Sequence, residues 1–208
     1  RSSDLAAIRG LPEAITRLGV NLVRTTALAV AMNQLMRSKE TAVFSEFTKV
    51  LWDHSLRAAA ASRVLARKLT RISPDEAMLA GLIHDLGAFY MLYRVTQYAE
   101  LRHRPDTIKY LIVQWHESIG VSLLNALGLP EEIVEATIDH DRLRSAPVII
   151  KNMSDIIYVA NMLSGGHIEW QAQDQPTLSA EICSLKEQYS HLQPAIDALA
   201  SELRGSLQ

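Results

Sequence analysis

The stretch from Leu79 to Gly87 constrains the fold more than any other part of this chain. It is almost entirely apolar, yet the adjacent residues His84 and Asp85 stand near its end. A carboxylate buried among apolar side chains costs free energy unless it is paired, hydrogen-bonded or bound to a metal. Just before this stretch, Ser73-Pro74-Asp75-Glu76 carries the signals of a helix start, and Gly87 suits a helix end. The sequence therefore predicts a buried helix that presents an imidazole and a carboxylate side by side, as half of a metal site.

Composition favours one helical domain and excludes several classes of protein. A chain of 208 residues can bury a substantial core, and its many alanines and leucines with few aromatics favour helices over sheets. The net charge of −2 gives no electrostatic basis for a nucleic-acid or anionic-membrane partner. The single cysteine, Cys183, excludes an internal disulfide and fits a reducing compartment. No apolar run approaches the roughly 20 residues that a membrane helix needs, so we expect an all-α cytoplasmic protein.

Apolar residues recur at helical spacing along most of the chain, and no segment alternates as a strand would. In the long segment 44–69, an apolar stripe should face the core, made of Leu51, Ala58, Leu65 and Leu69. We find no internal repeat, Gly-rich phosphate loop or nucleophile elbow. The expected helices cover 8–18, 20–36, 44–69, 74–87, 89–98, 110–127, 130–141, 147–163, 177–192 and 194–203, with a polar linker at 169–176.

The segment from Leu79 to Gly87 resembles the His-Asp signature of the HD superfamily of metal-dependent phosphohydrolases. With Glu76-Ala77 ahead of it, the segment is most similar to the HDOD branch, the HD-related output domains of bacterial signalling proteins. Further matches are Ala14-Ile15, Leu18-Gly19 and Leu129-Pro130, so that the resemblance covers roughly residues 8–165. Taken alone, segment 8–18 is equally well explained as an ordinary amphipathic helix. The resemblance implies a compact multi-helix HD-like bundle with the His-Asp helix at its centre.

The same resemblance implies a set of metal ligands contributed by several helices, which bundles use to build metal sites. His84 and Asp85 form its centre, and His54 stands where the superfamily places an upstream histidine. Taken singly, His54 is more often a hydrogen-bonded structural residue than a ligand. Mixed imidazole and carboxylate ligands suit iron, manganese, zinc, nickel or cobalt better than calcium. The implied set is His54, His84, Asp85, His116, His140 and Asp155.

Two positions depart from the pattern of catalytically active relatives. Ala88 stands where such relatives usually carry a lysine, and Asp141 stands where the family has the second histidine of a His-His pair. Asp141 either ligates a hard metal, orients His140 from outside the ligand set, or is a solvated residue at a helix end. Arg57, one turn from His54, is the candidate to supply the missing positive charge.

The resemblance implies a bacterial signal-transduction output module that is regulatory rather than catalytic, with a divalent metal either bound or absent. Its expected partners are signalling proteins or an upstream sensor or receiver domain, with a nucleotide as a further ligand. The alternative is a metal-dependent HD-type phosphohydrolase or phosphodiesterase that acts on a nucleotide or a cyclic dinucleotide. We expect the domain to span 1–168, truncated at its N-terminal side, with a linker and C-terminal helices at 169–208 packing on it.

Overall fold

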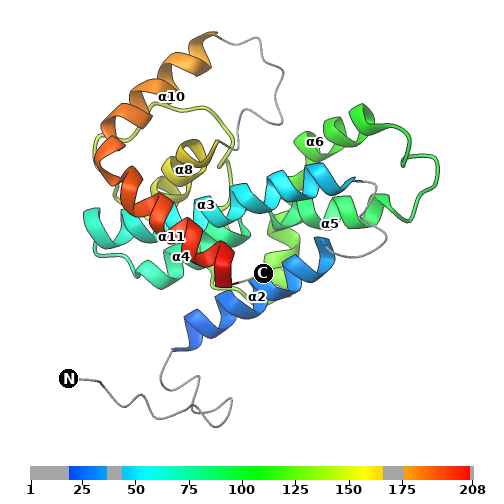
Figure 1. Ribbon diagram of the computed structural model, residues 1–208, viewed down its shortest axis with the longest axis horizontal. Helices are drawn as coiled ribbons and strands as arrows, with labels where there is room; N and C mark the ends of the chain where they lie inside the picture. Colours follow the sequence, from blue (N-terminus) through cyan, green and yellow to red (C-terminus); the bar gives the residue numbers. More distant parts are fainter. Residues whose placement is uncertain (1–18, 37–43, 166–175, 207–208) are drawn as a thin grey trace.

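The computed structural model describes residues 19–36, 44–165 and 176–206, and every regular element in these ranges is helical (Figure 1). The all-α prediction is therefore confirmed for the part of the chain that the structure describes, whereas the expected helix at 8–18 lies outside it. The helices are α2 (Val20–Met36), α3 (Ser45–Leu69), α4 (Pro74–Ile83), α5 (Leu86–Val95), α6 (Pro105–Ala126), α7 (Glu131–Ala136), α8 (Met153–Ser164), α10 (Pro176–Gln188), the short 3-10 helix η2 (Ser190–Leu192) and α11 (Gln193–Ser206). None of these described helices combines the length and apolarity needed to cross a bilayer.

Helix α3 is the centre of the bundle, because α4, α8 and α11 all pack against it (Figure 1). The predicted core stripe on α3 is buried at Leu51, Ala58 and Leu65, but Leu69 at its C-terminal end is 42% exposed. Around α3, α10 packs on α8 and α6 packs on α5. The metal-site candidates on α3 and near the end of α4 therefore lie in the most enclosed part of the molecule.

Two glycines allow helices to approach one another more closely than side chains would permit. A Cβ atom at Gly81 on α4 would lie 2.7 Å from the carbonyl oxygen of Ala58 on α3. A Cβ atom at Gly87 on α5 would lie 1.9 Å from the carbonyl oxygen of His116 on α6. Because both neighbours are backbone atoms, α4 lies directly against α3 at Gly81, and α5 lies directly against α6 at Gly87.

The helix that was expected to run from 74 to 87 is divided in the structure. Helix α4 ends at Ile83, and Asp85 precedes α5, with its carbonyl oxygen accepting from the backbone of Ala88 at 2.9 Å. Gly87 therefore lies in the first turn of α5 and does not end a helix. The break places His84 and Asp85 at a junction between helices instead of on one continuous turn.

Two other expected helices are shorter than the sequence indicated. The helix expected over 147–163 begins at Met153, because the Asn152 side chain accepts from the backbone N–H of Asp155 at 2.8 Å and caps the helix there. The helix expected from Pro130 to Asp141 ends at Ala136. This shortening places His140 and Asp141 in an irregular segment that packs against the site.

The predicted start of α4 is confirmed, because Ser73 precedes it and its side chain accepts from the backbone N–H of Glu76 at 3.4 Å. Replacing the cap in Ser73→Ala should lower the free energy of unfolding by about 1 kcal/mol. In Ser73→Asp, which retains a capping oxygen, stability should stay close to wild type. Urea denaturation of the three proteins checks this, and equal losses in both variants would show that the cap does not stabilise the helix.

The C-terminal helix α11 is held on α3 by two ion pairs between oppositely charged residues. Arg57 on α3 pairs with Asp197 at 2.9 Å, and Arg204 pairs with Asp53 on α3. Pairs this exposed contribute little individually. They lie on the face of α3 that the C-terminal helix covers, within one turn of His54.

Candidate metal centre

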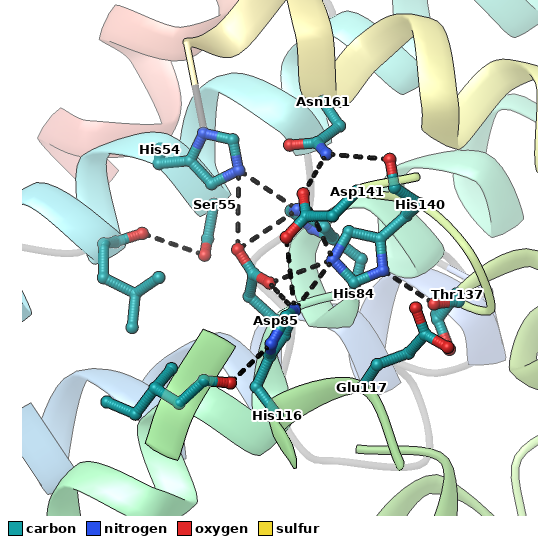
Figure 2. Close-up of polar contacts among 12 residues, drawn as sticks. His54, Ser55, His84, Asp85, His116, Glu117, Thr137, His140, Asp141 and Asn161 are labelled. Atoms are coloured by element: carbon teal, nitrogen blue, oxygen red, sulfur yellow. Dashed lines mark hydrogen bonds and ion pairs between the residues drawn. The ribbon is translucent and has the colours of Figure 1, made fainter. Parts of the chain in front are cut away.

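Four buried histidines surround the Asp85 carboxylate (Figure 2). His54 comes from the middle of α3, His84 from the end of α4, His116 from α6, and His140 from the segment after α7. The Asp85 carboxylate lies within 3.6 Å of all four rings, through Oδ2 to His54 and His84 and through Oδ1 to His116 and His140. Five of the six expected site residues therefore meet at one point, although they come from distant parts of the sequence.

Each of the four rings is oriented by a hydrogen bond from Nδ1 to a backbone carbonyl oxygen. Because a carbonyl oxygen only accepts, Nδ1 carries the hydrogen, and Nε2 is the ring nitrogen that faces the cluster. Metal-binding histidines are commonly fixed in this way, with one nitrogen donating and the other free to bind. The four pairs are His84 with Gly81 (2.8 Å), His116 with Ile112 (2.8 Å), His140 with Thr137 (2.7 Å) and His54 with Ser164 (3.4 Å).

The spacing of the ring nitrogens fits shared metal ions. The Nε2 atoms of His54 and His84 are 3.1 Å apart, and those of His116 and His140 are 3.4 Å apart. Two nitrogens that bind one ion at 2.0–2.1 Å, at angles between octahedral and tetrahedral, lie about 2.9–3.4 Å from each other. Asp85 contributes a carboxylate oxygen to each pair, and within each triad the ligand atoms lie within 4.8 Å of one another. The cluster can therefore bind a metal, with Asp85 common to both halves.

Burial and charge together set the protonation states in the cluster. Burial lowers the pKa of His84 to about 4, against the pull of the Asp85 carboxylate. Burial alone would raise the pKa of Asp85, but His84, His140 and His116 hold that pKa well below its usual value. Burial opposes charge on His140 as well, yet the carboxylates of Asp141 and Asp85 raise its pKa to about 10. His84 is thus neutral and Asp85 ionised, which are the states that bind metal. His140 would lose its proton when an ion binds.

Two further residues contact the cluster, one of which the sequence analysis did not identify. The Asp141 carboxylate lies 3.4 Å from Nε2 of His116 and 3.8 Å from Nε2 of His140. The Asn161 side chain on α8 donates to Asp141 at 2.8 Å and to the carbonyl oxygen of His140 at 3.1 Å. The available signal was an amide within the otherwise apolar run from Ile156 to Leu163, and the sequence analysis did not use it.

Asp155, the sixth expected site residue, does not join the cluster. Its carboxylate pairs with Arg144 at 3.2 Å and accepts from the backbone N–H of Lys151 at 3.0 Å. Asp155 belongs to neither of the two groups of close ligand atoms in the described chain, which are His54, His84 and Asp85, and Asp85, His116 and His140. Its partner is a cation outside the cluster, and the expectation that Asp155 completes the ligand set is not supported by its position.

Positive charge that could assist phosphate chemistry is already engaged elsewhere. Arg57, expected as a replacement cation, is ion-paired with Asp197, and Ala88 is fully buried. A cavity of about 470 Å³ adjoins His140 and is lined in part by Arg142 and Arg144. Arg144 stacks on the ring of Tyr158 at 4.6 Å in addition to its pairing with Asp155.

The geometry agrees with what comparison with known proteins finds. The family model of the HDOD domain matches residues 5–143. A solved structure from Shewanella amazonensis SB2B, provisionally named a metal-dependent phosphohydrolase, is similar with a TM-score of 0.69 and 22% sequence identity. That similarity covers 97% of this chain and 75% of the Shewanella chain, and at this identity it shows a shared fold. A search of curated proteins gives no match.

Proposed function

Because the chain belongs to the HDOD family, we propose that it is a regulatory output module of a bacterial signalling system, not a hydrolase. In this proposal it acts in the cytoplasm, where it passes an input from an upstream sensor or receiver domain to a protein partner. The His/Asp cluster, defined as His54, His84, Asp85, His116 and His140, holds a divalent transition metal that ties the surrounding helices together. Iron, manganese, zinc, nickel and cobalt all suit this donor set.

The observation that carries the proposal is the enclosure of the cluster. The side chains of its five members are at most 8% exposed. Asp141 is the more exposed neighbour, with 22% of its side chain open to solvent. A catalytic metal needs an open coordination position and room for an anionic substrate. Here an anion would meet a carboxylate at the accessible side, which supports a structural or sensing role for the ion.

Ala88 supplies no positive charge where active relatives usually carry a lysine, and this also supports a regulatory role. A bound ion can polarise a phosphoryl oxygen, but phosphate hydrolysis also depends on charge stabilisation by neighbouring donors. Losing one such donor typically costs about a hundred- to a thousand-fold in rate. Arg57 does not make up for this loss, because its charge is paired with Asp197.

A metal-dependent phosphohydrolase acting on a nucleotide or cyclic dinucleotide is the second candidate. The cavity of about 470 Å³ beside His140 favours it, because Arg142 and Arg144 line a space next to the cluster. The arginines of this cavity would then have to hold the phosphate group of the nucleotide. Arg144 would have to leave Asp155 to do so, which is the reason that we place this function second.

We expect no phosphodiesterase turnover from protein loaded with manganese, iron(II), nickel or cobalt. The assay uses cyclic dinucleotides and simple phosphate esters, with His84→Ala and Asp85→Ala measured beside the wild type. Turnover by the wild type that disappears in both variants would overturn the regulatory proposal in favour of the hydrolase. Residual turnover that persists in both variants would come from a contaminating enzyme and would leave the regulatory proposal supported.

A further inference from the structure

We propose that Asp141 is itself a metal ligand and that Asn161 is the residue that positions it. Together they would make the half of the cluster near His116 and His140 a second metal position, richer in oxygen donors than the half at His54. This inference rests on the proposed function only in requiring that the cluster binds metal. It assigns a role to Asp141, which departs from the histidine found at this place in the family pattern.

The position of Asp141 relative to the two rings supports a ligand role. Its Oδ2 is 3.4 Å from Nε2 of His116, and its Oδ1 is 3.8 Å from Nε2 of His140. The Oδ1 atom of Asp85 faces the same two nitrogens at 3.6 Å and 3.2 Å. Two imidazoles and two carboxylates thus converge on one small volume, as Figure 2 shows. The half at His54 and His84 has two imidazoles and shares only Asp85.

Asn161 restricts the Asp141 carboxylate to this orientation. Its side chain is 1% exposed, and its Nδ2 donates to Oδ1 of Asp141 at 2.8 Å and to the carbonyl oxygen of His140 at 3.1 Å. Because both partners are acceptors, the amide must present its nitrogen to them. The Asn161 amide therefore holds both the backbone of His140 and the side chain of Asp141.

The other atom of this amide has no protein partner among the described residues. With the nitrogen so engaged, Oδ1 of Asn161 is buried and has no hydrogen-bond partner in the described part of the chain. A buried oxygen without a donor is costly, and such atoms are uncommon unless they serve a bound ion or water. In Figure 2 the amide lies directly beside Asp141, at the edge of the cluster. In Figure 2 this oxygen lies on the side of the amide away from His140, so the ligand role of Asp141 rests on its own distances to the two rings.

The two halves should prefer different ions. Carboxylate and carbonyl oxygens suit manganese, whereas imidazole suits zinc, nickel and iron. A second carboxylate also offsets the charge of a second divalent ion close to the first. We therefore expect the position at Asp141 to favour Mn²⁺ and the position at His54 and His84 to favour Zn²⁺.

The test is a Mn²⁺ titration followed by electron paramagnetic resonance, with metal content measured independently. We expect the wild type to bind two Mn²⁺ ions and Asp141→Asn to lose about 10–100-fold or more in affinity for one of them. Asp139→Asn is the matched control, because it removes the same charge from the same segment. Asp139 has a φ of 56°, which asparagine tolerates, and its side chain is 63% exposed. This control should bind both ions as the wild type does.

Two more variants separate a positioning role from a general structural one. Asn161→Ala should weaken the same Mn²⁺ position by about 10–100-fold and leave the other unchanged. Asp141→His, which supplies the imidazole of the family pattern, should keep two ions but shift that position from Mn²⁺ towards Zn²⁺. A cooperative thermal unfolding transition of the chelator-treated protein shows whether each variant is folded before it is scored.

The outcomes distinguish this inference from the proposed metal centre. A wild type with two ions, of which Asp141→Asn loses one, supports the inference. If Asp141→Asn binds both ions as tightly as the wild type, Asp141 is not a ligand and the inference is overturned. A single ion that is lost in His84→Ala but kept in Asp141→Asn overturns the inference while the metal centre stands. A wild type that binds no ion overturns both.

Discussion

Gly87→Ala is expected to destabilise the protein by about 3 kcal/mol or more, which places it among the most severe single substitutions. The added Cβ atom would lie 1.9 Å from the carbonyl oxygen of His116 and 2.6 Å from the amide nitrogen of Gly120. Both are backbone atoms of α6, so neither can rotate away, and α5 and α6 must separate. Since His116 is a member of the His/Asp cluster, the same displacement should weaken metal binding.

Urea denaturation monitored by circular dichroism measures this loss, and Gly205→Ala is its matched control. Gly205 lies near the end of α11, and a Cβ atom there would meet nothing within 4 Å. The control should remain within about 1 kcal/mol of the wild type. A Gly87→Ala protein that unfolds at the same urea concentration as Gly205→Ala would show that α5 and α6 do not approach as closely as described.

Asp85→Asn is expected to abolish metal binding and to destabilise the metal-free protein. The carboxylate faces all four rings, and it is the one ligand common to both halves of the cluster. Without it, His140 keeps a partner in Asp141, but the half at His54 and His84 has no carboxylate. Removing one partner of a buried charged network costs about 3–5 kcal/mol. Denaturation in the presence of a chelator measures this loss apart from the loss of metal.

Asp155→Asn is the matched control, because it changes the other carboxylate that the family pattern implied. Asp155 pairs with Arg144 outside the cluster, and Arg144 is partly exposed. The variant should keep its metal and lose about 1–3 kcal/mol, because the buried Asp155 carboxylate also accepts from the Lys151 backbone. Loss of metal in Asp155→Asn without a larger loss of stability would place Asp155 in the ligand set after all.

The fold and most of the cluster could be predicted from the sequence, because local signals and the family pattern agreed. The His-Asp pair, the capping serine and the apolar background of the segment from Leu79 to Gly87 all indicated one buried element. The break at His84 and Asp85 was not visible, and it lies directly before the point at Gly87 where α5 packs closely on α6. A residue pattern reports helical preference, whereas a junction of this kind depends on a partner far away in the sequence.

The position of Asp155 apart from the cluster and the omission of Asn161 have a common physical cause. Six residues turn a helix by about 600°, so the two side chains point in directions roughly 120° apart. The sequence shows both polar groups on α8 but not which of them faces the cluster. Asp155 lies in the first turn of α8, next to the cap, whereas Asn161 reaches the segment of His140 and Asp141. Only the rotation of α8 against α3 decides between them.

The metal content of wild-type protein purified without a chelator, compared with Asp85→Asn, tests the metal centre most directly. We expect at least one divalent transition-metal ion per chain in the wild type, little or none in the variant, and a lower Tm once a chelator removes the ion. Wild-type protein that takes up no manganese, iron, zinc, nickel or cobalt, and whose Tm is the same with and without chelator, would contradict a metal-binding role for the four histidines and Asp85.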